Sequence, residues 1–123
     1  MLNEFSRSYG KTKVLTIEAL KEGFAKSQFS YVQIALLFGS RACGTQNDRS
    51  DYDFALLMCD EQTAWGMQSK AWHDIGIAFN LSDQDIDVID LAVADKVIIE
   101  SIKKGYWLLK GSEDDVERLF AKN

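Results

Sequence analysis

The sequence predicts an α/β (α+β) fold in which helices flank one small mixed β-sheet. Two nearly continuous apolar runs, at residues 31–38 and 52–59, have the length and composition of buried strands. Around these runs, apolar residues recur at intervals of three and four, as they do on amphipathic helices. The chain has 123 residues, no proline and no low-complexity segment that could act as a linker, so we expect one domain spanning residues 1–123.

The N-terminal half is predicted to contain one helix, two strands and a short helical turn. Val14, Ile17, Leu20 and Phe24 lie on one face of the predicted helix. Gly44 can close the helical turn, because glycine readily adopts the left-handed conformation found after a helix. In chain order we expect a helix at about residues 12–27, a strand at 31–38, a helical turn at 40–44, a polar loop at 45–50 and a strand at 52–59.

The C-terminal half is predicted to contain three helices and two strands. Residues 85–91 alternate acidic and aliphatic side chains, which is the period of a strand. Trp72 and Phe79 fall on one stripe of the preceding helix, and two lysines before Gly105 are typical of a helix C-terminus. In chain order we expect a helix at residues 62–80, a turn at 80–83, a strand at 85–91, a helix at 93–104, a short strand at 106–109 and a helix at 113–121.

Composition argues against several classes of partner. With a net charge of −5 and a pI of about 4.8, the chain shows no basic stripe, so we expect no direct contact with nucleic acid. No apolar run approaches the roughly 18 residues that span a bilayer, and the N-terminus lacks a secretory signal, so we expect no membrane partner and a cytoplasmic location. Cys43 and Cys59 are expected to be reduced, and a zinc site would lack ligands because His73 is the only histidine.

Candidate functional residues gather where the first strand ends and the second begins. The first strand runs into Gly39-Ser40, and ten residues later the second begins with Asp51-Tyr52-Asp53. Glycine has no Cβ, so the backbone at Gly39 can approach a phosphate, to which Ser40 adds its hydroxyl and its N–H. Asp51 and Asp53 are two residues apart on a strand, so both carboxylates point to one face. This combination predicts a site for a nucleoside triphosphate.

A third carboxylate is expected from the third strand. Asp87 stands between two aliphatic residues, where a lone buried carboxylate would be costly. If the third strand pairs with the second, Asp87 approaches Asp51 and Asp53, and the three carboxylates repel one another without a counterion. Two Mg²⁺ ions would remove this repulsion and bind the incoming and leaving oxygens of an in-line displacement. We therefore predict that all three acids are catalytic and metal-binding, with Asp87 near the acceptor hydroxyl.

Three segments together resemble a known family. Gly39–Gly44, Ser50–Asp53 and Ile86–Leu91 are similar to the motifs of the minimal nucleotidyltransferases of the polymerase-β-like superfamily, most closely those of MntA-type antitoxins that pair with HEPN-domain toxins. The resemblance covers about residues 12–120 at the level of element order and implies the polymerase-β-like fold. Its specific part is the spacing between Gly-Ser and Asp-x-Asp.

Two details of the resemblance concern individual residues. Asp85 and Asp90 compete with Asp87 as the third acid, and Asp87 is preferred because the family's third acid precedes an aliphatic pair and then Asp-Leu, as here. One departure from the family is Cys43, where many members carry arginine. On their own, Asp85 and Asp90 are expected at strand edges, and Cys43 is expected to pack as a small apolar residue.

The resemblance implies an antitoxin that transfers AMP from ATP, with Mg²⁺, to a tyrosine hydroxyl of a cognate HEPN ribonuclease toxin and so neutralises it. It implies nucleotide-binding roles for Gly39, Ser40, Arg41 and Ser50, and either Arg41 or Arg49 could reach a phosphate. Two alternatives remain open: a non-enzymatic antitoxin that acts by binding alone, and a nucleotidyltransferase with a small-molecule hydroxyl acceptor. The complete set of three acids favours an enzyme, and the short chain favours a protein acceptor.

Overall fold

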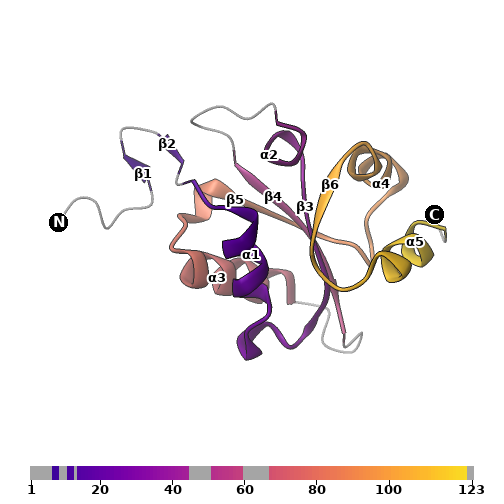
Figure 1. Ribbon diagram of the computed structural model, residues 1–123, viewed down its shortest axis with the longest axis horizontal. Helices are drawn as coiled ribbons and strands as arrows, with labels where there is room; N and C mark the ends of the chain where they lie inside the picture. The colour runs from indigo at the N-terminus through magenta and orange to yellow at the C-terminus, as the bar shows by residue number, and fades with distance from the viewer. Residues whose placement is uncertain (1–6, 9–10, 13, 45–50, 60–66, 122–123) are drawn as a thin grey trace.

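A four-stranded sheet lies between two pairs of helices in the computed structural model of the chain (Figure 1). The structure describes residues 7–8, 11–12, 14–44, 51–59 and 67–121. On one side of the sheet lie α1 (Ile17–Phe24) and α3 (Met67–Phe79), and on the other lie α4 (Lys96–Lys103) and α5 (Glu113–Ala121). The predicted α/β architecture is confirmed.

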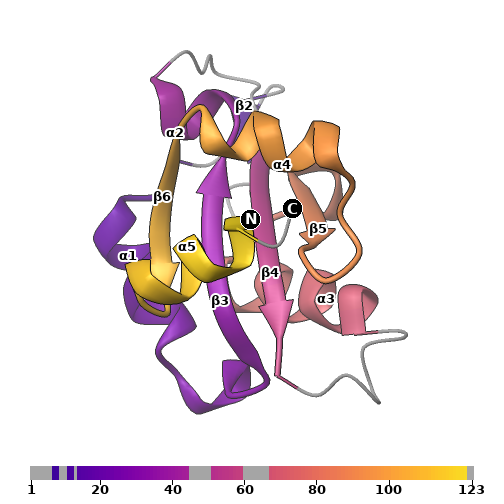
Figure 2. The same cartoon turned by 90° about the vertical axis from the view of Figure 1, so that its right-hand side faces the viewer.

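The order of the strands brings four strand ends to one place. The sheet runs β5 (Ile86–Asp90), β4 (Tyr52–Met58), β3 (Val32–Phe38), β6 (Tyr106–Lys110), as Figure 2 shows. β3 is antiparallel to both of its neighbours, and β4 is parallel to β5. The C-terminal end of β3 and the N-terminal ends of the other three strands therefore meet. We call this the Gly39 end of the sheet.

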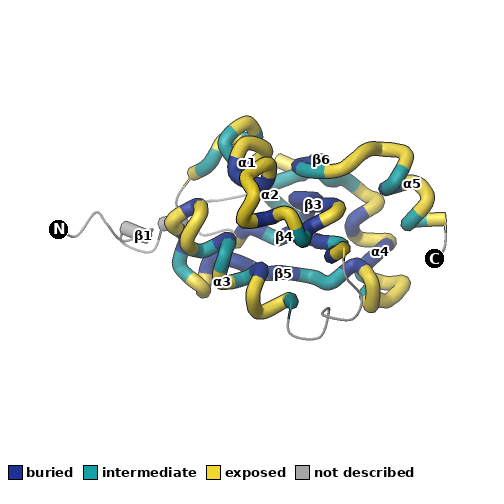
Figure 3. The backbone as a smooth tube through the Cα atoms, turned by 90° about the horizontal axis from the view of Figure 1, so that it is seen from below, coloured by how far each residue is buried: buried dark blue, intermediate teal, exposed yellow. Residues whose placement is uncertain are grey.

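The sheet buries an apolar core on each of its faces, because successive side chains of a strand alternate between faces. Along β4, Tyr52 and Phe54 belong to the cluster that packs beneath α1 and α3, while Ala55 belongs to the cluster beneath α4 and α5. Figure 3 shows the strands largely buried and the outer turns of the helices exposed. The strands are therefore held from both sides.

Aromatic rings dominate the core on the α1 and α3 side. Phe24 lies with its ring centroid 4.7 Å from that of Phe29, 5.7 Å from that of Phe54 and 5.5 Å from that of Phe79. Each such pair contributes about 0.5–1.5 kcal/mol beyond its buried area. The ring of Tyr52 extends this cluster toward the Gly39 end, because it stacks on Phe54 at 6.1 Å.

The first helix is shorter than the sequence predicts. α1 begins only at Ile17, because the Thr16 hydroxyl oxygen accepts a hydrogen bond from the Ala19 N–H (3.1 Å) and caps the helix there. It ends at Phe24, and a short 3₁₀ turn, η2 (Ser27–Phe29), follows. The residues ahead of it include a two-stranded pair that was not predicted, β1 (Arg7–Ser8) and β2 (Lys11–Thr12).

The remaining elements lie close to their predicted positions. Gly44 (φ 76°) ends the predicted helical turn, α2 (Ser40–Cys43), in the left-handed conformation. α4 starts later than predicted because the Asp95 carboxylate accepts a hydrogen bond from the Ile98 N–H (2.9 Å) and caps it. A second 3₁₀ turn, η4 (Asp83–Asp85), occupies part of the predicted turn and leads into β5. The loop at 45–50 and residues 62–66 of the predicted third-helix segment lie outside the described residues.

The two cysteines are free thiols, as expected, but Cys43 is exposed. The prediction that it packs as a small apolar residue is therefore wrong. It occupies the last turn of α2, which stands at the surface of the Gly39 end beside Gly105, so no core is available to it.

Packing of α1 on α3 depends on Gly23. A Cβ at this buried position would overlap the Phe79 ring. Gly23→Ala should therefore lower the free energy of unfolding by about 1–2 kcal/mol, because overpacking outweighs the roughly 1 kcal/mol gained in helix propensity. Urea denaturation measures this change. Lys21→Ala, at an exposed position of the same helix, should change stability by less than about 0.5 kcal/mol; a stabilised Gly23→Ala protein would contradict the proposed contact.

Candidate functional site

One row of side chains crosses the sheet at its Gly39 end. In the pairing register, Asp87 lies beside Asp53, Asp53 beside Phe38, and Phe38 beside Tyr106. Paired residues of neighbouring strands point to the same face, so the row begins with two carboxylates and continues with two aromatic rings. The predicted pairing of the second and third strands is present, and it places Asp87 directly beside Asp53.

Asp53 and Asp87 lie side by side on one face of the sheet. In the part of the chain that the structure describes, neither carboxylate forms an ion pair with lysine or arginine. Burial, together with the negative charges of Asp87 and Asp51, raises the pKa of Asp53 to about 6. Asp53 is therefore held in a position where its ionised form is disfavoured.

Asp51 stands at the rim of this site. It is exposed, immediately before β4, and two residues from Asp53, so its charge contributes to the raised pKa of Asp53. Among the described residues, no three or more acidic, histidine or cysteine side chains are grouped so that together they could hold a metal ion, so the structure does not bring Asp51, Asp53 and Asp87 into one ligand set. Ionised carboxylates repel one another, so drawing all three together would require a counterion between them. Their hard oxygen donors are nevertheless those that Mg²⁺ prefers.

The turn after β3 packs directly against these acids. Gly39 has φ 80° and ψ −156°, a backbone conformation that residues with a Cβ rarely adopt. A Cβ on Gly39 would also overlap Oδ2 of Asp53. The Gly39 carbonyl accepts the N–H groups of Ala42 and Cys43, both at 3.1 Å, which closes the short α2. Glycine is thus required at this position for two reasons: the backbone has a positive φ, and a Cβ would overlap the Asp53 carboxylate.

Arg41 lies against Tyr52. The guanidinium carbon of Arg41 is 4.3 Å from the centroid of the Tyr52 ring. Tyr52 and Asp53 are consecutive on β4, so Tyr52 projects to the face opposite Asp53. Two other predicted residues, Arg49 and Ser50, lie outside the described residues. The structure therefore positions Gly39 beside Asp53, and the nucleotide contacts predicted for Gly39, Ser40 and Arg41 remain predictions.

Two residues of this region, Asp85 and Tyr52, are fully buried. Asp85 was expected at a strand edge; it lies immediately before β5, and its exposed fraction is 0%. It is buried because η4 turns the chain inward before β5 begins. The other residue is Tyr52, which is 1% exposed. Burial raises the pKa of Tyr52, against the lowering effects of Arg41 and the Leu15 N–H, and Asp85 raises it further.

Three further residues considered from the sequence are Asp90, His73 and Trp72. Asp90 is half-buried at the end of β5, and its Oδ1 accepts a hydrogen bond from the Ala92 N–H (3.0 Å), which supports the following turn. His73 is exposed. Trp72 is half-buried against the core, as its helical stripe predicted, and its indole N–H donates to the Asp83 carbonyl (3.3 Å).

Comparison with known proteins decides the family. The family described as polymerase beta, nucleotidyltransferase, matches residues 18–114. The chain belongs to this family. It is therefore a nucleotidyltransferase enzyme, as the Gly-Ser and Asp-x-Asp motifs predicted.

Two curated relatives of this nucleotidyltransferase are both named protein adenylyltransferase MntA. The relative from Shewanella oneidensis is 33% identical over 108 residues, which cover 85% of this chain and 68% of the relative. The relative from Aphanizomenon flos-aquae is 29% identical over 100 residues, which cover 75% of this chain and 67% of the relative. The resemblance to MntA-type proteins inferred from the sequence is confirmed.

The fold is shared with a solved toxin–antitoxin complex that contains AMP-PNP. A chain of that complex aligns with a TM-score of 0.62 and 26% identity, covering 88% of the nucleotidyltransferase described here and 83% of that chain. None of the helices that the structure describes in our chain combines the length and apolar character needed to cross a membrane.

The raised pKa of Asp53 predicts a specific pH dependence of stability. Between about pH 3.8 and pH 6 the folded state binds more protons at Asp53 than the unfolded state, so stability falls as pH rises through this window. Asp53→Asn removes the unfavourable charge, and without metal at pH 7.5 it should raise the free energy of unfolding by about 1–2 kcal/mol, after allowance for solvent screening.

Thermal melts in EDTA from pH 3.5 to pH 8 would measure this effect. The gain should vanish at the acidic end of the series, where the wild-type carboxyl is protonated in both states. Asp51→Asn, at the exposed position, is the matched control and should stabilise less. If Asp53→Asn were less stable than wild type at pH 7.5, the repelling pair of carboxylates would not exist in solution.

Gly39 offers a second test of the site geometry. Gly39→Ala should lower stability by about 2 kcal/mol or more, because it combines a strained positive φ with overlap at Asp53. Gly44→Ala is the matched control. It shares a positive φ (76°), but a Cβ there meets no atom within 4 Å, so it should cost only the backbone term, about 1 kcal/mol. Equal losses in the two variants would contradict the close approach of Gly39 to Asp53.

Proposed function

We propose that this nucleotidyltransferase is an antitoxin that transfers AMP from ATP to a tyrosine hydroxyl of a HEPN ribonuclease toxin. The family membership supplies the reaction type, since a nucleotidyltransferase moves a nucleoside monophosphate. The curated relatives are named protein adenylyltransferases, and a solved relative is a toxin–antitoxin complex with AMP-PNP. These findings support ATP as the donor and a toxin protein as the acceptor.

One observation carries the proposal: Asp53 and Asp87 lie side by side, with no ion pair to a described lysine or arginine, next to a turn that favours glycine. A pair of half-buried carboxylates without a counterion costs stability, and carboxylates with perturbed pKa values in such pairs are concentrated at functional sites. Asp51, Asp53 and Asp87 would hold Mg²⁺, and we propose two ions. When bound, Mg²⁺ neutralises the triphosphate and stabilises charge on the attacking and leaving oxygens.

The residues of this chain then have separate tasks. Gly39 lets the backbone approach the triphosphate, and Ser40 offers its hydroxyl and its N–H to the β and γ phosphates. The tyrosine oxygen of the toxin forms a bond to the α phosphorus as the bond from that phosphorus to the bridging oxygen breaks. Pyrophosphate leaves, and the hydroxyl proton passes to a nearby carboxylate, a role that we assign to Asp87. We include Ser50 among the nucleotide-binding residues.

The charge of the chain also bears on the partner. A net charge of −5 favours association with a basic protein surface, such as that of an enzyme that binds RNA. ATP and the RNA that such a toxin would cut are both cytoplasmic, so we place the reaction in the cytoplasm. Neither nucleic acid nor a membrane is required by the proposal.

Incubation of the chain with a purified HEPN partner, ATP and Mg²⁺ tests the reaction directly. Intact-mass spectrometry should show one or more AMP-sized additions on the partner, and peptide mapping should place them on tyrosine. Asp53→Asn and Asp87→Asn should each lower the rate by at least about 10³-fold, because each removes a metal-binding carboxylate. ATP with a methylene group between the α and β phosphates should not support transfer.

The outcomes separate the proposal from its alternatives. Inhibition of the toxin with no mass increase would show an antitoxin that acts by binding alone. Pyrophosphate release that needs a small hydroxyl compound in place of the toxin would show a small-molecule acceptor. Transfer at nearly the normal rate by Asp53→Asn would show that the acid row is not the catalytic site.

A further inference from the structure

The Arg41–Tyr52 contact joins the two halves of the proposed nucleotide site. Arg41 follows Ser40 in α2, and Tyr52 stands between Asp51 and Asp53 at the start of β4. The two segments are connected along the chain by residues 45–50, and through space by the guanidinium on the ring, 4.3 Å from its centroid. An arginine stacked on an aromatic face is attracted to it by the ring quadrupole and packs flat on it.

The ring that carries Arg41 is fixed at several points. Tyr52 is 1% exposed, and its ring stacks on Phe54 with 13° between the ring planes. Its hydroxyl oxygen accepts a hydrogen bond from the Leu15 N–H (2.8 Å), which ties the chain just before α1 to β4. A buried side chain held by stacking and by a hydrogen bond has little freedom to rotate, so the platform beneath Arg41 is rigid.

Strand pairing also places Tyr52 at the start of β5, because its register partner there is Ile86. Asp85, fully buried at the end of η4, is close enough for its negative charge to act on Tyr52. Arg41 acts on the same group with the opposite sign. Tyr52 therefore meets α2, the segment before α1, and the chain leading into β5 and Asp87, while its two sequence neighbours are the proposed metal-binding acids.

We infer that Arg41 and Tyr52 are positioning residues, which hold the Gly39–Ser40 turn in place against the strand that bears Asp51 and Asp53. Arg41 acts on the nucleotide through the Tyr52 ring, from the face of β4 opposite Asp53. This inference rests on the proposed site for Mg²⁺ and ATP, and it replaces a direct contact between Arg41 and phosphate.

A double-mutant cycle on Mg·ATP binding tests this inference without the toxin. Affinity is measured by displacement of a fluorescent ATP analogue, for wild type, Arg41→Ala, Tyr52→Met and the double variant. Methionine keeps most of the side-chain volume but removes the ring. Each single variant should weaken binding about threefold to tenfold, and the double variant should be no more than about twofold weaker than the weaker single variant, because the two residues act as one unit.

Two results would overturn the inference. One is a loss of Mg·ATP affinity in the double variant equal to the product of the losses in the single variants (multiplicative losses), and the other is no loss in either single variant. Multiplicative losses would mean that Arg41 contacts the nucleotide itself. If wild type fails to bind Mg·ATP, the proposed function is at fault and not the positioning pair.

Hydrogen exchange without nucleotide gives a second measurement, which also decides the matter if Tyr52→Met does not fold. Arg41→Ala should speed exchange of the backbone amides of residues 40–44 about tenfold, because the turn loses its attachment. An arginine that only contacts phosphate would leave this exchange unchanged, and that result would also overturn the inference.

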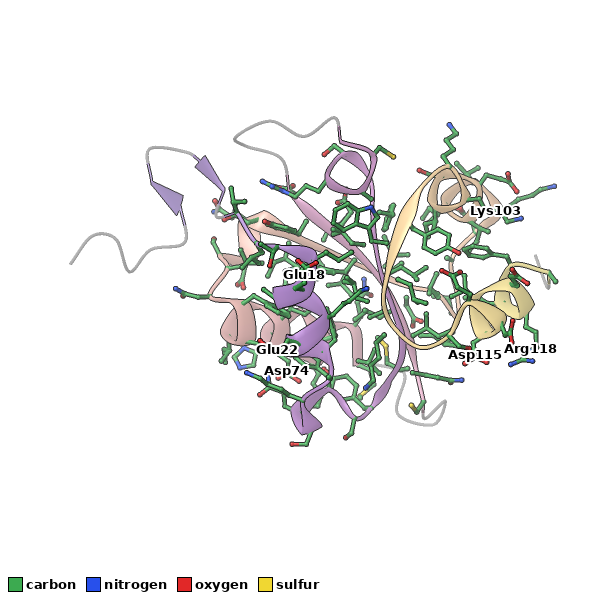
Figure 4. All side chains as sticks on the ribbon, in the orientation of Figure 1. Glu18, Glu22, Asp74, Lys103, Asp115 and Arg118 are labelled. Carbon is green, nitrogen blue, oxygen red and sulfur yellow. The ribbon has the colours of Figure 1, made fainter. Side chains whose placement is uncertain are left out.

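A similar tyrosine elsewhere in the chain provides the control. The Tyr31 hydroxyl donates to Asp74 (2.7 Å), and the Lys70 ammonium lies 4.9 Å from the centroid of its ring. Figure 4 shows Asp74 on α3, at the opposite end of the molecule from α2. Tyr31→Met should lower the melting temperature but leave Mg·ATP affinity and exchange at residues 40–44 within about twofold of wild type. A loss of affinity as large as that in Tyr52→Met would assign the effect to general loosening of the fold.

Discussion

Repulsion between the carboxylates of Asp53 and Asp87 is the constraint around which the Gly39 end of the sheet is arranged. The parallel pairing of β4 and β5 places the two acids side by side, and the described residues offer them no ion pair. The turn after β3 then comes so close to Asp53 that only glycine fits. Cations that bind together with a polyanion would relieve this repulsion. The arrangement is therefore suited to binding them.

The rest of the domain supplies the rigidity that this arrangement needs. The strands are packed on both faces, and the aromatic cluster of Phe24, Phe29, Phe54 and Phe79 reaches Tyr52 directly behind the acids. Two like charges can be held together only if the backbone that carries them cannot relax away. Stability and activity thus oppose each other locally: the same carboxylates that destabilise the metal-free domain are those proposed to hold Mg²⁺.

Patterns in the sequence predicted an element correctly where a single local feature, such as an apolar run, determines it. The apolar runs predicted β3 and β4, and the Asp-x-Asp motif predicted that Asp51 and Asp53 stand at the start of β4. Prediction failed where a capping side chain or a neighbouring element decided the outcome. Thr16 and Asp95 begin their helices later than periodicity alone suggests. The full burial of Asp85 was not predicted, because it depends on η4, which apolar periodicity does not reveal.

The linear order of residues was enough to indicate the fold class and the family, and it suggested the three acids of the proposed site, because strand alternation and motif spacing are properties of the chain alone. The contacts between separate segments could not be predicted from the sequence and are defined only in the folded structure. Register made Asp87 the partner of Asp53, and packing laid Arg41 on Tyr52. These choices depend on how separate segments meet in space, and a one-residue shift of a strand would have turned each side chain to the other face of the sheet.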